Sequence, residues 1–315
     1  MEPLNHFMYW WQAIILGVLQ GFTEYLPVSS SGHLAVGELI FGLHVPVSID
    51  VLLHLATIIP TIWVFREKLG SLLRSFCLLA RHIVADAGRR IGFRCGNGAT
   101  IPPNRSLQVA DDGRYIALVL LITLFTFIVG YPQKNLGLKF QAQIVAGAFL
   151  FTAFLLMLQY FLLRHRHKNQ VGKKDGIVCL SPISQVSRLK IFGLGVCLGI
   201  AQGIAAVPGV SRSGLTISMA LLLGFKRREA GELSFIISIP VIVGAVLLDI
   251  QEITAIVGSG ASIFPLLHLL GAFVAACISG FVALRWLLLL LNKGNFHFFA
   301  IYLVLFSGFV FWYFS

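Results

Sequence analysis

Near the start of the chain, residues Gln20–His33 gather a carboxylate, an amide, a run of hydroxyls and an imidazole within an apolar region. An ionisable side chain inside such a region is costly unless it is paired or hydrated, so we interpret Glu24 as functional. The alternative is that the Glu24 carboxylate reaches the membrane–water interface, near one end of a helical hairpin formed by this region. Gln20 lies one helical turn earlier, on the same face of a helix. Together, Gln20 and Glu24 can present oxygens to a hard divalent cation such as Mg²⁺ or Ca²⁺.

The serines and the histidine that follow are candidates for nucleophilic and acid–base chemistry. Ser30 or His33 can act as a nucleophile, and a neutral imidazole can also act as a general base. Serine is a favoured helix N-cap, so at least one of Ser29, Ser30 and Ser31 is expected to cap the following helix. A buried structural histidine is the alternative for His33.

A weaker copy of this stretch lies 182 positions later in the chain, where Gln202-Gly203 matches Gln20-Gly21. At the same offset, Ser211-x-Ser213-Gly214 matches Ser29-x-Ser31-Gly32, and the shared pattern is LG-x2-QG-x7-S-x-S-G-x9-G. Chance similarity between apolar segments is common, but this many matched small or polar positions at one offset is not. The pattern predicts an internal duplication whose two copies face each other across one site.

The second copy contributes a cation, Arg212, at the start of an apolar segment. The N-terminus of a helix favours anions through its free N–H groups, and a guanidinium forks onto phosphate oxygens. Structural pairing of Arg212 with Glu24 is the alternative. The candidate phosphate-binding residues of the two copies are Ser29, Ser31, Gly209, Ser211, Ser213 and Thr216.

This combination of groups suits hydrolysis of a phosphoric anhydride. A divalent cation held by Glu24 and Gln20, together with Arg212, would neutralise charge on the transferring phosphoryl group. Ser30 or His33 would attack or activate water. Because these residues lie in apolar surroundings, the expected substrate is a phosphorylated lipid whose tail stays in the bilayer.

The composition places the site in a membrane. Of the 315 residues, 57% are hydrophobic and 12% charged, and the mean hydropathy of +0.86 excludes an ordinary soluble globule. The net charge of +11 is concentrated in residues 66–94, 164–190 and 226–228. Basic clusters that flank spans are typical of cytoplasmic loops rather than of nucleic-acid binding. Contact with anionic membrane lipids is a secondary interpretation of these clusters.

Apolar segments predict an all-α polytopic membrane protein made of two halves. The first half, 1–163, holds a re-entrant hairpin at 8–43. Because the backbone of such a hairpin is broken, it must be surrounded by protein or by a water-filled cavity. Spans follow at about 50–65, 115–131 and 142–163, with a basic loop over 66–94, an irregular excursion over 88–113 and a basic connector at 164–190. The second half, 191–315, holds a hairpin at 191–225 and spans at about 233–250, 265–291 and 296–314.

Each half therefore holds one hairpin and three crossings, which is an odd number. The second half must lie upside down relative to the first, as an inverted-topology repeat with the site near the midplane. The basic loops are then cytoplasmic and both termini lie outside. His54 and His268 fall inside predicted spans without polar neighbours in the sequence, and we assign them no function.

Two long motifs resemble a known family. Gln20-x3-Glu24 followed by Leu26-Pro-Val-Ser-Ser-Ser-Gly-His33, with Pro208-Gly-Val-Ser-Arg-Ser-Gly-Leu-Thr216 later, is similar to the bacterial undecaprenyl-diphosphate phosphatases, often called bacitracin-resistance proteins. The resemblance covers the whole transmembrane plan. By this resemblance the essential residues are Glu24, Ser30, His33 and Arg212, supported by Gln20, Ser211, Ser213 and Thr216. Gln20 stands where many members carry a second glutamate, which lowers the charge of the site.

The resemblance implies removal of one phosphate from undecaprenyl diphosphate, a polyprenyl diphosphate lipid. This reaction recycles the lipid carrier for peptidoglycan and other envelope polymers. The resemblance also implies dependence on a divalent metal, a bacterial inner-membrane location, a site open to the periplasm and an inverted-repeat fold. The oligomeric state, including a homodimer, is left open.

Parts of the sequence also fit other functions. Inverted repeats with broken helices are also typical of transporters, so a lipid-phosphate or ion-coupled transporter is the main alternative. A dual function, hydrolysis with return of the carrier across the bilayer, is a hypothesis of the same origin. The acid-phosphatase-like membrane family is disfavoured, because it needs a histidine where this chain has Ser218.

Overall fold

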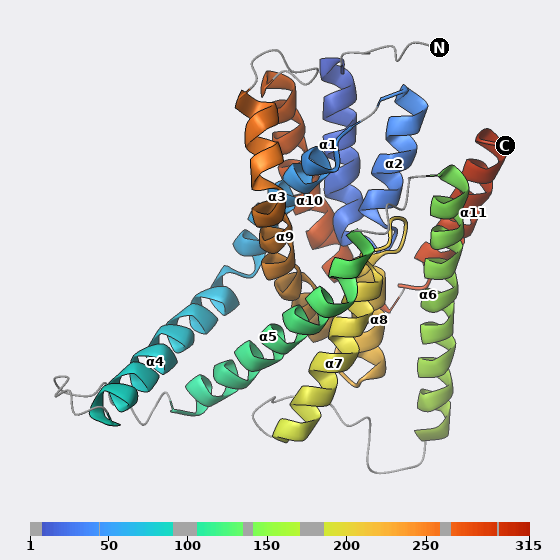
Figure 1. Cartoon of the computed structure of the whole chain (residues 1–315). Coiled ribbons are helices and arrows are strands. Elements are labelled where there is room, and N and C mark those ends of the chain that lie inside the picture. The colour runs from blue at the N-terminus through green and yellow to red at the C-terminus, as the bar shows by residue number, and fades with distance from the viewer. Residues whose placement is uncertain are drawn as a thin grey trace.

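The computed structural model describes residues 8–43, 45–90, 106–134, 141–170, 186–258, 266–294 and 296–315, and throughout these ranges the regular structure is α-helical. The helices are distributed over both halves of the chain (Figure 1). The first half contains α1 (Trp10–Tyr25), α2 (Ser30–Phe41), α3 (Val47–Val64), α4 (Arg66–Arg90), α5 (Ser106–Lys134) and α6 (Ala142–Gln170). The second half contains α7 (Arg188–Ile204), α8 (Arg212–Leu222), α9 (Arg227–Gly258), α10 (Leu266–Lys293) and α11 (Phe298–Tyr313).

Five of the described helices are long and apolar enough to cross a membrane, so the chain is a multi-pass membrane protein. The segments that meet this criterion are Val47–Val64, Val109–Gln133, Ala142–Arg166, Arg227–Ala255 and Leu266–Lys293. The remaining predicted span, 296–314, corresponds to α11, which is apolar but only 16 residues long.

Two short helix pairs form where the sequence predicts hairpins, α1–α2 and α7–α8. The serines of the repeated motif cap the second helix of each pair, because Ser29 Oγ accepts a hydrogen bond from Gly32 N and Ser211 Oγ accepts one from Gly214 N. This matched capping confirms the expected N-cap role of a serine. At the other end of α2, Gly42 adopts a left-handed conformation with φ of 64°, which suits glycine at a helix C-terminus.

The repeated glycines allow close approach between helices. A Cβ added at Gly21 would overlap the backbone of α10, and one at Gly199 would lie 2.9 Å from the Ile122 carbonyl oxygen of α5. Accordingly, α1 packs along α10 and α7 packs along α5 in the most extensive helix contacts of the molecule. Small residues spaced one turn apart permit this kind of packing in membranes. The duplicated glycines therefore fix both hairpins against long helices.

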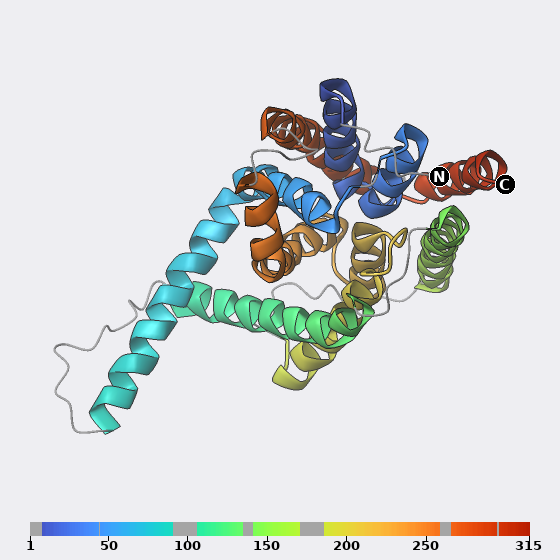
Figure 2. The ribbon, with the colours of Figure 1, turned by 45° about the horizontal axis from the view of Figure 1, so that its top comes forward.

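The basic region over 66–94 was predicted as a loop, and this prediction is wrong for residues 66–90, which form α4. Polar contacts tie the helix to α5, because Ser75 Oγ donates to Asp112 Oδ2 at 2.7 Å and Lys68 Nζ lies 3.8 Å from Asp112 Oδ1. α4 crosses the start of α5 and extends away from the other helices (Figure 2).

The predicted irregular excursion and basic connector are also partly helical. Residues 88–90 belong to α4 and residues 106–113 belong to α5, while 91–105 lie outside the described residues. Within the connector, α6 continues to Gln170 and α7 starts at Arg188, while 171–185 lie outside the described residues. Basic side chains mark these segments as non-spanning but do not prevent helix formation, since Lys and Arg are good helix formers.

Candidate active site at the hairpin tips

The predicted meeting of Glu24 and Arg212 is confirmed. Glu24 is in the last turn of α1 and is only 5% exposed. Its Oε1 forms an ion pair with the guanidinium of Arg212, the first residue of α8. Its Oε2 accepts hydrogen bonds from Ser30 Oγ at 2.7 Å and from Gln20 Nε2 at 3.0 Å. One buried carboxylate thus joins the chemical groups of both hairpins.

Hydrogen bonds from side chain to backbone also join the two tips. Ser213 Oγ donates to the Leu26 carbonyl at 2.9 Å, and Gly209 N donates to Ser31 Oγ at 3.5 Å. Gly209 has φ of 89°, and Ser29 adopts a positive φ of 70° despite its side chain. Non-glycine residues rarely take this conformation, and such strain is found where surrounding structure imposes it, often at functional sites.

The hydroxyls of the second copy mainly build the start of α8. Ser211 Oγ caps Gly214, while Ser211 N donates to Thr152 Oγ1 at 3.2 Å. Thr216 Oγ1 donates to the Arg212 carbonyl at 2.8 Å. Arg212 Nη1 also donates to the Ser234 carbonyl of α9 at 3.4 Å. These bonds hold Arg212 in place. The predicted phosphate-binding serines and threonine of this copy therefore already have contacts that position the start of α8.

His54, to which the sequence suggested no function, lies at the site. Its Nε2 is 3.3 Å from Glu24 Oε2 and 3.4 Å from Ser30 Oγ. Its Nδ1 is 2.7 Å from the Asp50 carbonyl oxygen, which can only accept, so Nδ1 carries a proton. The sequence did contain an indication of this function, since an ionisable residue inside a span is functional by default. Its proximity to Glu24 depends on how α3 packs against α1.

His33 has different surroundings from the other predicted catalytic residues. Its Nδ1 is 2.7 Å from the Ser29 carbonyl oxygen, and its Nε2 is 2.8 Å from the Tyr302 hydroxyl. Its ring stacks on Phe306 with centroids 4.5 Å apart. Both ring nitrogens thus have partners other than Glu24. His33 joins α2 to α11 at the edge of a cavity.

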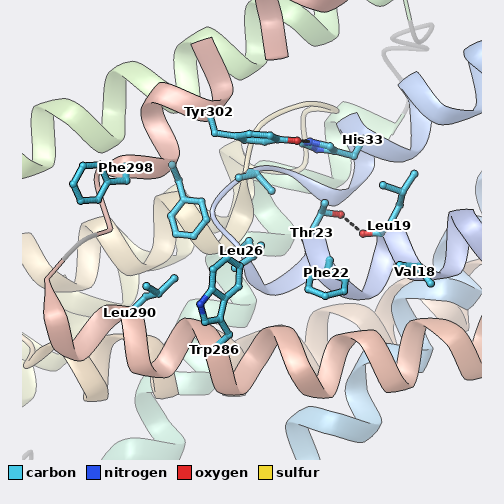
Figure 3. Close-up of a pocket in the computed structure, with 12 residues that line it drawn as sticks. Val18, Leu19, Phe22, Thr23, Leu26, His33, Trp286, Leu290, Phe298 and Tyr302 are labelled. Carbon is cyan, nitrogen blue, oxygen red and sulfur yellow. Dashed lines mark hydrogen bonds between the residues drawn. The ribbon is translucent and has the colours of Figure 1, made fainter. Parts of the chain in front are cut away.

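This apolar cavity of 590 Å³ begins next to the first hairpin, α1–α2. Phe22 and Leu26 of the first hairpin line it together with Trp286 of α10, and His33 and Tyr302 lie at its opposite edge (Figure 3). Its volume falls in the range of small-molecule sites. Glu24, Ser30 and Arg212 do not line this cavity, but residues of the same hairpin on either side of Glu24 do. An apolar cavity on the hairpin that carries a buried carboxylate and hydroxyl suits a ligand with a charged head and an apolar tail.

The groups at Glu24 also fit a divalent cation whose remaining ligands would come from a substrate. Gln20 is fully buried, and its Oε1 has no hydrogen-bond partner among the described residues. Across the described ranges, His, Cys, Asp and Glu side chains form no cluster of three or more that would hold a metal alone. Mg²⁺ is commonly bound by one or two carboxylates and by substrate phosphates. Glu24 and the orphaned amide oxygen of Gln20 match such an incomplete protein site.

Comparison with known proteins adds independent findings. The model of the family described as "Bacitracin resistance protein BacA" matches residues 13–309. The undecaprenyl-diphosphatase of Desulforapulum autotrophicum is 34% identical over 294 residues, which cover 93% of this chain and 94% of the relative. That of Desulfosudis oleivorans is 34% identical over 313 residues, covering 99% and 98%. That of Treponema denticola is 32% identical over 294 residues, covering 93% of each.

Proposed function

The chain belongs to the bacitracin resistance protein BacA family, and we infer that it is a membrane phosphatase that hydrolyses undecaprenyl diphosphate to undecaprenyl phosphate and inorganic phosphate. It thereby recycles the lipid carrier used for peptidoglycan and other envelope polymers. The observation that carries this function is the contact of Ser30, Glu24 and Arg212 inside the helical bundle, next to an apolar cavity.

Ser30 is the nucleophile in the mechanism that the contacts support. Its hydroxyl already donates to Glu24 Oε2, so the carboxylate can take the proton as Ser30 Oγ bonds to the terminal phosphorus. The bond from that phosphorus to the bridging oxygen breaks, and undecaprenyl phosphate leaves with the bridging oxygen. The guanidinium of Arg212 moves from Glu24 toward the equatorial phosphate oxygens, where negative charge is carried in the transition state.

Water then hydrolyses the phosphoserine. It attacks phosphorus, Glu24 returns the proton it took from Ser30 to Oγ as the bond from Oγ to phosphorus breaks, and both protons of the water leave with inorganic phosphate. His54 is within reach of both Ser30 Oγ and Glu24 Oε2, so it also orients the attacking hydroxyl. His33, whose ring nitrogens are engaged by Ser29 and Tyr302, holds the wall of the cavity rather than attacking phosphorus.

A divalent cation, Mg²⁺ or Ca²⁺, would be held by Glu24 and by the amide oxygen of Gln20. When bound, such an ion neutralises charge on the diphosphate. The buried Gln20 Oε1 without a partner supports this assignment, although the Gln20 amide must rotate to turn this oxygen toward Glu24, because its Nε2 now donates there.

The prenyl tail leaves the site through the apolar cavity. Phe22 and Leu26 are close in sequence to Glu24, and Trp286 faces them from α10. At 590 Å³ the cavity accommodates only the isoprene units nearest the diphosphate. The rest of the undecaprenyl chain stays in the bilayer, where it loses no hydrophobic contact with lipid.

The two halves form an inverted repeat in a bacterial inner membrane. This arrangement is supported by equivalent packing, α1 along α10 and α7 along α5, with α3 against α9 and α6 against α11 pairing equivalent helices of the two halves. α11 is then the sixth crossing. The basic helix ends are cytoplasmic by the positive-inside rule, and the termini and the site opening are periplasmic.

Phosphate release by the purified protein tests the function against the transporter alternative. In detergent with undecaprenyl diphosphate and Mg²⁺ or Ca²⁺, we expect steady turnover to undecaprenyl phosphate and inorganic phosphate, abolished in Glu24→Ala. Turnover absent with both cations would leave a transporter as the better explanation. The hydroxyl bonded to a carboxylate argues against that alternative, since a carrier has no need of a nucleophile.

A further inference from the structure

A second cavity, of 1050 Å³, lies away from the catalytic residues, among the C-terminal part of α6, the turn between α8 and α9, and the connection from α10 to α11. Neither Glu24, Ser30 nor Arg212 lines it. Its most distinctive feature is its charge. The cationic side chains that line it are Arg164, Arg166, Lys226, Arg227 and Arg228, and none of the described residues that line it is Asp or Glu.

Two of the guanidinium groups are held in place by backbone. Arg166 Nη1 donates to the Leu222 carbonyl at the end of α8 at 2.7 Å, and Arg227 Nη1 donates to the Asn292 carbonyl near the end of α10 at 3.3 Å. Gly294 makes room for the second one, because a Cβ there would lie 2.7 Å from Arg227 Nη1. Guanidinium groups fixed through one nitrogen keep their other N–H donors directed outward, which suits phosphate recognition.

The cavity is also at the level where membrane spans end. Arg166 and Arg227 are terminal residues of two candidate spans, and a third ends at Lys293, next to the lining residue Asn292. Lipid phosphates lie just beyond the hydrocarbon at this level. Apolar side chains complete the wall, among them Leu163, Leu291 and Phe296. A cationic wall beside an apolar wall matches a lipid head group and the start of its acyl chains.

We propose that this cavity, the basic interfacial pocket, binds the phosphate head group of an anionic phospholipid. Basic pockets between spans on the cytoplasmic side are suited to such head groups. The bound lipid would bridge α6 of the first half to α8–α9 and α10–α11 of the second. Since α8 begins with Arg212, the lipid would stabilise the helix that positions this residue. The proposal does not depend on the reaction at the hairpin tips.

Lipid titration of the purified protein in detergent tests the proposal, with thermal unfolding and native mass spectrometry as readouts. Phosphatidylglycerol should raise the Tm and remain bound, whereas zwitterionic phosphatidylcholine should do neither. The double variant Arg166→Ala/Arg227→Ala should bind phosphatidylglycerol at least roughly tenfold more weakly, because each cation near an anionic head group contributes ~1 kcal/mol. The matched control, Arg74→Ala/Lys190→Ala, removes two exposed cations outside the pocket and should bind like wild type.

A second variant protects the test against misfolding. Lys226 is exposed on the pocket wall and has only a 4.0 Å contact to Glu229, so Lys226→Gln should fold normally and still weaken binding about fivefold. Equal binding of phosphatidylcholine, unchanged binding by Lys226→Gln and the double variant, or an equal Tm increase from inorganic phosphate alone would each overturn the proposal.

Discussion

Glu24 and Arg212 are 188 positions apart in the sequence and form a buried ion pair where the two hairpins meet. The pair uses one carboxylate oxygen, while the other receives the Ser30 hydroxyl. A buried charge without a partner is strongly unfavourable, so each residue stabilises the other until a substrate enters. We propose that an incoming diphosphate replaces the carboxylate as the partner of Arg212.

Removal of the attacking hydroxyl should abolish turnover without unfolding the protein. Ser30→Ala should lower kcat at least roughly a thousandfold, because no other hydroxyl donates to Glu24 Oε2 in the described site. Phosphate release and a Tm measurement check this. Ser218→Ala is the control, since this buried hydroxyl on α8 has no hydrogen-bond partner in the part of the chain that the structure describes, and its loss should leave activity intact. Substantial turnover by Ser30→Ala would exclude it as the nucleophile.

The shape of the Arg212 side chain should matter as much as its charge. Arg212→Lys should reduce kcat/KM on the order of a hundredfold, because an ammonium cannot fork onto two phosphate oxygens. The exposed Arg74 provides the control, and Arg74→Lys should behave like wild type. Near-normal rates in Arg212→Lys would remove Arg212 from phosphate binding and leave it a structural partner of Glu24.

His54 and His268 both lie within candidate spans but should differ in importance. His54→Ala should reduce kcat roughly a hundredfold, because Nε2 lies beside both Ser30 Oγ and Glu24 Oε2. His268→Ala is a matched control, since His268 also bonds a backbone carbonyl through Nδ1, that of Met8, but is not at the site. Equal effects of the two substitutions would indicate that His54 is only structural.

A second carboxylate at position 20 should strengthen cation binding. Gln20→Glu places two carboxylates one helical turn apart, so they repel each other in the absence of metal and share a cation in its presence. We expect a lower Tm without metal, a larger metal-induced increase in Tm, and about tenfold less Mg²⁺ or Ca²⁺ at half-maximal activity. An unchanged metal dependence in both measurements would place the cation elsewhere.

Gly21, one of the repeated glycines, should tolerate no side chain. Gly21→Ala should destabilise the protein by ~1–3 kcal/mol, because the added methyl overlaps the Ala276 carbonyl and Ser279 of α10. Gly147→Ala is the control, since a Cβ there meets nothing within 4 Å. Thermal unfolding in detergent compares the two variants. A Gly21→Ala protein as stable as Gly147→Ala would contradict the close packing of α1 on α10.

The internal repeat in the sequence allowed several parts of the site to be predicted. The two serine motifs gave both hairpins, their capping serines and the meeting of Glu24 with Arg212. Polar residues within apolar segments are few enough that such matches stand out. The six predicted spans all coincide with helices, but α11 is shorter than a typical crossing.

Other features depend on tertiary packing or on weak periodicity. His54 reaches Glu24 only because α3 packs against α1, which no local pattern encodes. His33 lies in the motif, yet stacking on Phe306 and bonding to Tyr302 direct its ring toward α11. In α4, the basic residues indicate a segment that does not span the membrane, and this led to the prediction of a loop. The apolar residues of the same segment recur at helical spacing, which is the pattern that predicts a helix.

Mapping the phosphorylated residue tests the central claim most directly. Wild-type protein mixed with undecaprenyl diphosphate labelled in its terminal phosphate, quenched during turnover and digested, should yield a labelled peptide that contains Ser30. The label should be absent from Ser30→Ala and strongly reduced in Glu24→Ala. A label on His33, or one that persists in Ser30→Ala, would contradict the account in which Ser30, bonded to Glu24 and faced by Arg212, receives the phosphoryl group.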